Sequence, residues 1–228
     1  MSEIRLSPNQ RQIVEADDGA VLVLAGAGSG KTRVLTERVR YLLSSKPGKF
    51  KILALTFTNK AAEEMRNRLK GVDDIQNRTF IGTIHKFCLE LIRTQGSAIG
   101  LSEMPHIFER ENDRLEVLIE VFNNNPIFKQ NLNQLNDETK RKKYLYDVLG
   151  YISQKKKDLF GIIEQVEQDD KELNLLFREY NSVLASQNAI DFDDVICLAY
   201  KIFGERPKVA ELYRKIYKYI CIDEAHYM

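Results

Sequence analysis

Residues 25–32 read AGAGSGKT, a glycine-rich run that follows the apolar residues 20–24 and precedes a stretch with helical periodicity. Glycine adopts backbone angles closed to other residues, so Gly26, Gly28 and Gly30 can turn consecutive N–H groups toward an anion at a helix N-terminus. Lys31 would reach the β- and γ-phosphates, and Thr32 would offer its hydroxyl to Mg²⁺. The run therefore predicts a nucleoside triphosphate site, and a glycine-rich turn without a ligand is the alternative.

Composition bounds the class of protein more loosely. The chain has 228 residues, enough for a buried core in one domain or two, and its charged residues (29%) balance to a net charge of +1. A nucleic-acid surface must therefore be a local patch. The apolar runs are too short to span a membrane, and the first residues lack the basic and apolar segments of a signal peptide. We expect a soluble, cytoplasmic protein with no membrane partner.

The cysteines and histidines show no pattern of a metal site. Cys88, Cys197 and Cys221 are odd in number and scattered along the chain. Such cysteines suit reduced, buried thiols better than a disulfide framework or a zinc site. The three histidines have no ligand spacing either.

Predicted strands and helices alternate along the first 95 residues. We expect a buried strand at residues 21–24 and further strands at 51–57 and 78–81. The helices after them carry apolar stripes, made of Leu35, Val39 and Leu42, then Ala61, Ala62, Met65 and Leu69, then Ile84, Phe87, Cys88, Leu91 and Ile92. Strands that alternate with helices predict an α/β fold with a parallel sheet covered on both faces.

The pattern changes between residues 96 and 188. This stretch contains helical stripes, polar linkers and no convincing strand, so we expect an all-helical insertion of roughly 90 residues, within the usual domain range. It holds two basic runs, at residues 140–143 and 155–157. Runs of charge are usually solvated surface, and phosphate contact is the alternative for both of them.

The α/β pattern returns with helices expected at 192–203 and 208–218 and a strand at 219–222, which ends in Asp223-Glu224. A carboxylate at a strand tip beside a phosphate loop can hold Mg²⁺, and a second one can orient the water that attacks the γ-phosphate. We assign the first role to Asp223 and the second, catalytic role to Glu224. Solvated charge on a surface turn is the alternative for this pair.

Several motifs in order along the chain resemble those of superfamily 1 DNA helicases of the UvrD/Rep/PcrA type. Residues 6–10 (LSPNQ) resemble the adenine-reading Q motif, and the Ala-first form of the phosphate loop is the form of this family. Residues 55–62 (LTFTNKAA) with Met65 resemble motif Ia, and residues 82–88 (GTIHKFC) resemble motif Ib. Ile152-Ser153 with Lys156 and residues 190–194 (IDFDD) match two further segments of the family.

The resemblance implies a P-loop NTPase (RecA-like) fold that binds ATP and Mg²⁺. Nucleotide binding would fall to Gln10, Ala25, Gly26, Ala27, Gly28, Ser29, Gly30, Lys31, Thr32 and Arg33, and Mg²⁺ to Thr32 and Asp223. Lys31 and Glu224 would be catalytic. Single-stranded DNA would contact Phe57, Thr58, Asn59, Thr83 and His85. The composition of Phe57 with its flanking threonines supports this, because bases stack on aromatic rings while hydroxyls contact phosphates.

The resemblance also implies a domain order. Residues 1–95 would form the first part of the ATP-binding domain 1A, residues 96–188 the inserted domain 1B, and residues 189–228 the second part of 1A. After Asp223-Glu224 the family has a glutamine and an aspartate where this chain has His226 and Tyr227. That departure puts in doubt the coupling of hydrolysis to movement.

The resemblance implies a parent protein that translocates 3′ to 5′ on single-stranded DNA and acts at single-strand/duplex junctions. Since the family's second motor domain (2A/2B) would lie beyond Met228, we expect this chain to bind Mg²⁺-ATP weakly, to hydrolyse it very slowly and not to unwind duplex. Another P-loop enzyme is one alternative, although a GTPase would need an aspartate after Asn59-Lys60. A non-motor module that binds DNA or a partner protein is the other.

Overall fold

The computed structural model describes residues 6–26, 28–158 and 171–224, and the chain divides into two compact units. The first unit comprises Met1–Phe87 and Lys208–Met228, and the second comprises Cys88–Pro207. Helices of the first unit are α1 (Pro8–Val14), α2 (Lys31–Ser45), α3 (Asn59–Arg68), α4 (Ile75–Arg78) and α11 (Pro207–Ile216), and α5 (Ile84–Gln95) begins in it.

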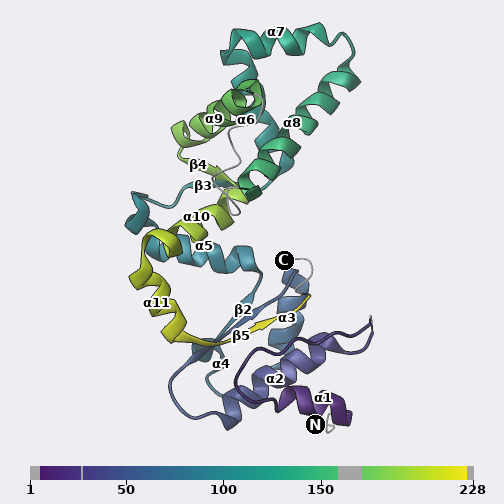
Figure 1. Cartoon of the computed structure of the whole chain (residues 1–228), viewed down its shortest axis with the longest axis vertical. Helices are drawn as coiled ribbons and strands as arrows, with labels where there is room; N and C mark the ends of the chain where they lie inside the picture. Colours follow the sequence, from purple (N-terminus) through teal and green to yellow (C-terminus); the bar gives the residue numbers. More distant parts are fainter. Residues whose placement is uncertain (1–5, 27, 159–170, 225–228) are drawn as a thin grey trace. The chain divides into compact units, whose positions relative to one another are not determined.

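A parallel sheet of three strands lies at the centre of the first unit (Figure 1). Its order is β2 (Thr79–Gly82), β1 (Lys51–Leu55) and β5 (Tyr217–Ile222). Leu55 at the end of β1 pairs with Gly82 on one side and with Ile222 on the other. The carboxyl ends of all three strands therefore meet at one edge of the sheet, which is where α/β sheets bind ligands.

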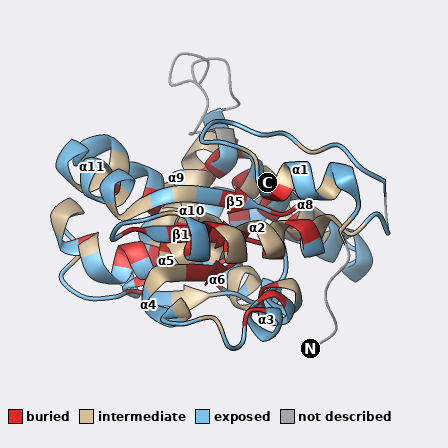
Figure 2. Ribbon diagram, turned by 90° about the horizontal axis from the view of Figure 1, so that it is seen from below, coloured by how far each residue is buried: buried red, intermediate tan, exposed pale blue. Residues whose placement is uncertain are grey.

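Helices α2 and α3 pack on one face of this sheet through the apolar stripes expected from the sequence. Val39 and Leu42 of α2 and Met65 of α3 are fully buried against Ile52 and Ala54 of β1. Figure 2 shows the buried residues in red, and β1 is buried at every position after Lys51. On the opposite face, Leu53, Leu55 and Phe80 form a smaller cluster, against which Phe87 and Tyr217 pack.

The prediction of a strand at residues 21–24 is wrong. This segment forms no strand in the structure, and Leu22 and Leu24 are 80% and 86% exposed. The described sheet ends at β5, and no described backbone hydrogen bond joins residues 21–24 to it. Residues 21–24 pair with neither open edge of this sheet, so their backbone forms no strand and their apolar side chains stay exposed.

The second unit is built on helices α6 (Glu111–Asn124), α7 (Pro126–Gln134), α8 (Glu138–Asp158), α9 (Lys171–Ser186) and α10 (Phe192–Glu205), with a short 3₁₀ helix at Gly96–Ile99. Its core contains Leu118 and Phe122 of α6, Phe128 of α7, Ile152 of α8 and Leu176 of α9. The helical character expected for residues 96–188 is thus largely confirmed.

The stretch between residues 96 and 188 is not all-helical, however. β3 (His106–Phe108) pairs in parallel with β4 (Ala189–Asp191), so that a two-stranded sheet joins the two ends of the segment. A strand of three residues is too short to show an alternating pattern, which explains why the sequence did not reveal it. The α10 helix packs against α8 and β4, and for this reason the compact unit extends to Pro207.

Strand and helix ends elsewhere differ by a few residues from the sequence-based bounds. β1 ends at Leu55 rather than at residue 57, and β2 spans Thr79–Gly82 rather than 78–81. α11 and β5 begin at Pro207 and Tyr217, somewhat earlier than expected. None of the described helices is long and apolar enough to cross a membrane.

Candidate functional site

The phosphate loop adopts the turn that its glycines permit. Gly28 and Gly30 have φ angles of 75° and 88°, in the left-handed region that favours glycine, whereas Gly26 has no positive φ. Gly30 caps α2, which begins at Lys31, and the amide of Val34 donates to the Gly30 carbonyl at 2.9 Å. The loop therefore leads directly into a helix N-terminus, where backbone N–H groups have no partner within the helix.

Lys31 is folded back over this loop. Its Nζ donates to the carbonyl oxygens of Ala25 and Gly26, both at 3.3 Å, and lies 3.7 Å from Oε1 of Glu224. The lysine thus has a carboxylate and two carbonyl dipoles around its charge.

Thr32 and Asp223 meet directly. The Thr32 hydroxyl donates to Oδ2 of Asp223 at 2.7 Å. Asp223 is buried at the end of β5, and its amide donates to the Leu55 carbonyl at 2.8 Å, which continues the sheet by one hydrogen bond. The sheet thereby fixes the carboxylate next to the first turn of α2.

Glu224 follows with a φ of 56°, an uncommon angle for a residue with a side chain. The Glu224 carboxylate lies beside Lys31. The carboxylates of Asp223 and Glu224 therefore lie beside the Lys31-Thr32 pair, as the sequence led us to expect.

Gln10 joins the same region from α1. Ser7 and Gln10 form a capping box, in which the Gln10 Oε1 accepts from the Ser7 amide at 2.9 Å. Its Nε2 donates to the Ser29 carbonyl at 3.2 Å, so the glutamine lies beside the phosphate loop. The Arg38 guanidinium of α2 donates to the Val14 carbonyl at 2.8 Å and holds α1 against α2.

Other loop residues are placed as follows. The Ser29 hydroxyl donates to the Gly26 carbonyl at 2.8 Å, within the loop, and Arg33 is exposed on the first turn of α2. Ala27, His226 and Tyr227 lie outside the described residues.

The residues expected to contact DNA follow two adjacent strands at the same edge of the sheet. Phe57, Thr58 and Asn59 come after β1 and are exposed, with Phe57 at 54%. Thr83 and His85 follow β2 and are half-buried. Both threonine hydroxyls accept helix-capping amides, at 3.1 Å from Ala61 and 3.2 Å from Lys86, so they also start α3 and α5.

A buried ionic cluster in the second unit was not expected from the sequence. Lys156 is only 1% exposed, and its Nζ lies 2.8 Å from Oδ2 of Asp191 and 2.7 Å from Oδ2 of Asp194. Arg114 lies 3.5 Å from Asp191, and the Tyr180 hydroxyl donates to the same carboxylate at 3.2 Å. We call these five residues the Lys156 cluster.

The Lys156 cluster connects the two family-like segments that the sequence contains, because Lys156 belongs to the first and both aspartates to the second. Burial raises the pKa of Asp191, but the charges of Lys156 and Arg114 outweigh it and hold that pKa below its ordinary value. Burial raises the pKa of Asp194. Tyr180 lies 11 positions before Asp191 and Arg114 much further before it, each on a different element, so no local spacing could have identified them.

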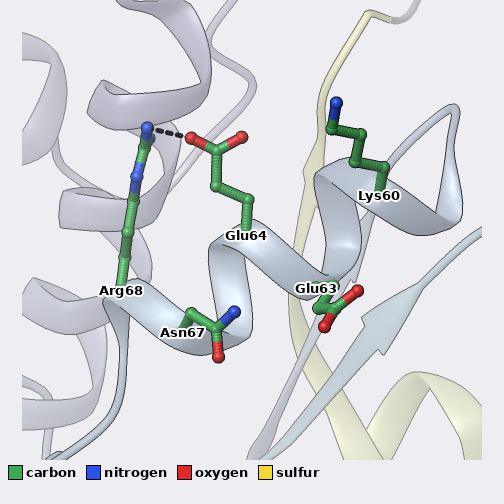
Figure 3. Close-up of a pocket in the computed structure, with 5 residues that line it drawn as sticks. All are labelled: Lys60, Glu63, Glu64, Asn67 and Arg68. Carbon is green, nitrogen blue, oxygen red and sulfur yellow. Dashed lines mark hydrogen bonds and ion pairs between the residues drawn. The ribbon is translucent and has the colours of Figure 1, made fainter.

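The pocket in Figure 3 is separate from these residues. Five exposed side chains of α3 line it, namely Lys60, Glu63, Glu64, Asn67 and Arg68. The Arg68 guanidinium donates to the Glu64 carboxylate within the pocket. Since the pocket shares no residue with the phosphate loop or the strand ends, it is not the predicted nucleotide site.

Known proteins match almost the whole chain. The family model described as UvrD/REP helicase N-terminal domain matches residues 6–226. ATP-dependent DNA helicase PcrA of Bacillus subtilis (strain 168) is 35% identical over 238 residues, which cover 96% of this chain. The PcrA proteins of Leuconostoc citreum and of Staphylococcus aureus (strain Mu50 / ATCC 700699) are 32% and 33% identical, again over 96% of this chain.

The matched region is only part of each relative, and the chain spans 29% of the length of these three proteins. The motif order, the α/β architecture with its parallel sheet and the match to residues 6–226 agree with one another. The chain therefore belongs to the family of UvrD/REP helicase N-terminal domains.

Proposed function

We propose that the chain is the N-terminal ATP-binding portion of a DNA helicase that moves 3′ to 5′ on single-stranded DNA and hydrolyses ATP with Mg²⁺. The observation that carries the proposal is the 2.7 Å contact between the Thr32 hydroxyl and the Asp223 carboxylate beside the phosphate loop. The relatives are named ATP-dependent DNA helicases, which supports the same reading. Residues 1–95 and 189–228 would form domain 1A, and residues 96–188 domain 1B.

The nucleotide would bind along the loop and the N-terminus of α2. Gln10 would hydrogen-bond the adenine edge, and the backbone amides of residues 25–33 would hold the phosphates. Lys31 would leave the Ala25 and Gly26 carbonyls, which it contacts at 3.3 Å, for the β- and γ-phosphate oxygens. A charged acceptor forms the stronger hydrogen bond, so this exchange favours binding.

The donor set also fits Mg²⁺. A hydroxyl and a carboxylate oxygen are the ligands that this hard cation prefers, and Thr32 and Asp223 present one of each. When bound, the ion would neutralise charge on the phosphate oxygens. Glu224 would act as the base that orients the attacking water, because it follows Asp223 directly and lies beside Lys31.

Single-stranded DNA would cross the strand ends of β1 and β2. The exposed ring of Phe57 offers a stacking surface for a base, and Thr58, Asn59, Thr83 and His85 would contact the backbone. Hydrolysis at full rate needs a positive charge that arrives from the second motor domain, and the loss of such an arginine costs about 10³ to 10⁵ in rate.

Replacement of Lys31 tests the nucleotide site. We expect Lys31→Ala to abolish Mg²⁺-ATP binding measured by calorimetry, while Lys49→Ala, which removes an exposed lysine of the same unit, leaves it unchanged. Equal ATP binding by both variants would overturn the proposal. If DNA or a partner protein binds equally well to the Lys31→Ala variant, with and without ATP, a non-motor binding module would be favoured instead.

Replacement of Phe57 tests the DNA track. Loss of one stacked base should weaken the affinity of Phe57→Ala for a single-stranded oligonucleotide by about 1 to 3 kcal/mol. Phe57→Tyr keeps an aromatic face and should bind as the unmodified chain does. An unchanged affinity of the alanine variant would remove Phe57 from the DNA track.

A further inference from the structure

Two arginines near the end of α3, two positions apart, make different contacts. The Arg68 guanidinium donates to the Glu64 carboxylate, one turn earlier in the same helix (Figure 3). The Arg66 Nη1 donates instead to the backbone carbonyl of Ile81 in β2, at 2.6 Å. No ion pair within the described residues involves Arg66. Of the two side chains, that of Arg66 is therefore the one that links α3 to the sheet.

The carbonyl that Arg66 contacts lies on the open side of β2. Within the described residues β2 pairs only with β1, so it is an edge strand. The next carbonyl, that of Gly82, points toward β1 and accepts the Thr56 amide at 2.9 Å. Because the carbonyls of neighbouring residues point to opposite sides of a strand, the Ile81 carbonyl points away from β1. The Arg66 guanidinium thus occupies the position of a donor from a further strand.

This contact holds the last turn of chain before β2 ends. Ile81 is buried, so water has little access to the group that Arg66 contacts. A backbone carbonyl that loses its partner in such a place costs free energy, and a charged donor forms one of the stronger hydrogen bonds. The pairing of β2 with β1 does not involve Arg66. Loss of the guanidinium should therefore displace the end of β2 and leave the rest of the sheet in place.

The contact lies between the two segments proposed to bind single-stranded DNA. Residues 57–59 form the first segment, and α3 begins there, at Asn59. Thr83 and His85 belong to the second segment, which follows β2 directly. Arg66 thus joins the helix that begins at the first segment to the strand that ends at the second.

We propose that Arg66 is a positioning residue for single-stranded DNA, which fixes the 83–85 segment relative to residues 57–59 without contacting the DNA itself. The inference rests on the proposed function and adds to it a residue outside the proposed contacts. One DNA strand must meet both segments, and stacking and hydrogen bonding act only over short distances. A displaced 83–85 segment would therefore lower the affinity although every contact residue is present.

The test compares variants of the 228-residue chain. Arg66→Ala removes the contact with β2, and Arg66→Met removes the donor but keeps most of the stem. Arg68→Ala removes the same charge from the same helix. Arg78→Ala removes an arginine that precedes β2 and donates to the Leu43 carbonyl at 3.0 Å, so it controls for the loss of such a contact away from the DNA segments. Fluorescence anisotropy over a series of salt concentrations measures the affinity for a single-stranded oligonucleotide, and urea denaturation checks folding.

We expect both Arg66 variants to bind about fivefold more weakly than the Arg68→Ala and Arg78→Ala controls, within the range for residues coupled through one hydrogen-bond network. A positioning residue gives up no phosphate contact, so the slope of the salt dependence should stay unchanged. Direct contact with a phosphate would make that slope less negative by about 0.7. Affinity equal to that of the controls would overturn the inference, and so would this change of slope.

A double-variant cycle tests how Arg66 acts. Since both segments hold one strand, Arg66→Ala/Phe57→Ala should lose less affinity than the product of the two single losses. Single losses that simply multiply would overturn the positioning role. If Phe57→Ala has no effect, the proposed DNA track fails and this inference fails with it. If Phe57→Ala weakens binding and the Arg66 variants do not, only this inference fails.

Discussion

The Thr32 hydroxyl and the Asp223 carboxylate lie 2.7 Å apart, although 191 positions separate them in the chain. Two local structures produce this contact. Gly30, with its positive φ, starts α2 at Lys31, and β5 pairs with β1 so that its end lies at the same edge of the sheet. The proposed nucleotide site thus depends on the register of β5 as much as on the loop.

If both residues hold one Mg²⁺ ion, their effects on nucleotide binding must be coupled. Thr32→Val and Asp223→Asn should each weaken Mg²⁺-ATP binding, and the double variant should lose less than the sum, with a coupling of about 0.5 to 3 kcal/mol. Calorimetry of the four proteins measures this cycle. The same cycle in EDTA is the control and should show little coupling. Strictly additive losses with Mg²⁺ present would exclude a shared ion.

The exposed segment at residues 21–24 should tolerate substitution. Leu22→Ala removes a side chain that is already in water, so the free energy of unfolding should change by no more than about 0.5 kcal/mol. Leu42→Ala empties a core position and should cost about 2 to 5 kcal/mol. Urea denaturation of both variants checks this, and comparable losses would indicate that Leu22 is buried in a strand.

The Lys156 cluster should contribute strongly to the free energy of unfolding, whereas the adjacent exposed residue Lys157 should not. Lys156→Ala leaves Asp191 and Asp194 without their buried cation and should cost about 3 to 5 kcal/mol of unfolding free energy. Lys157→Ala alters an exposed residue one position away and should cost no more than about 0.5 kcal/mol.

A rescue experiment separates the charge of Lys156 from its bulk. In Lys156→Met/Asp191→Asn/Asp194→Asn the unpaired carboxylates are gone, so part of the lost stability should return. Chemical denaturation at neutral pH measures both effects. A single Lys156→Ala variant as stable as Lys157→Ala would show that the cluster contributes nothing to stability.

Burial raises the pKa of Cys88 and Cys221 to about 11 and that of Cys197 to about 12. Their folded pKa values lie above those of an unfolded chain, so the neutral thiols contribute stability that is complete below about pH 8.5 and is lost as the pH rises toward 11. The free energy of unfolding should therefore fall between about pH 9 and 11. Chemical denaturation at a series of pH values measures it. A variant with all three cysteines replaced by alanine should show a smaller fall.

The same pKa values predict slow alkylation. At pH 8 the folded chain should react slowly with iodoacetamide, and unfolding in urea should make all three thiols reactive. Mass spectrometry of the alkylated chain gives the number of thiols that have reacted. Rapid reaction of Cys88 or Cys221 in the folded protein would contradict the burial of these two thiols.

Local patterns in the sequence predicted the local structure well. The stripes of α2, α3 and α5 are confirmed because helical periodicity records which side of a helix is buried, as with Val39, Met65 and Leu91. Residues 21–24 were misassigned because an apolar run indicates only a preference for burial. A strand also requires pairing, and residues 21–24 pair with neither edge strand of the described sheet.

The sequence by itself determined the glycine-rich loop, the helix that follows it and the motif order that led to the family, since each depends on residues close together in the chain. Only the tertiary structure decided that Thr32 meets Asp223 and that Lys156 is buried between two aspartates. It also decided that the lysines of residues 140–143 face water while Lys155 and Lys156 do not. The physical reason is that burial and pairing of charges depend on neighbours that packing brings together, and two similar basic runs do not show in the sequence which neighbours those are.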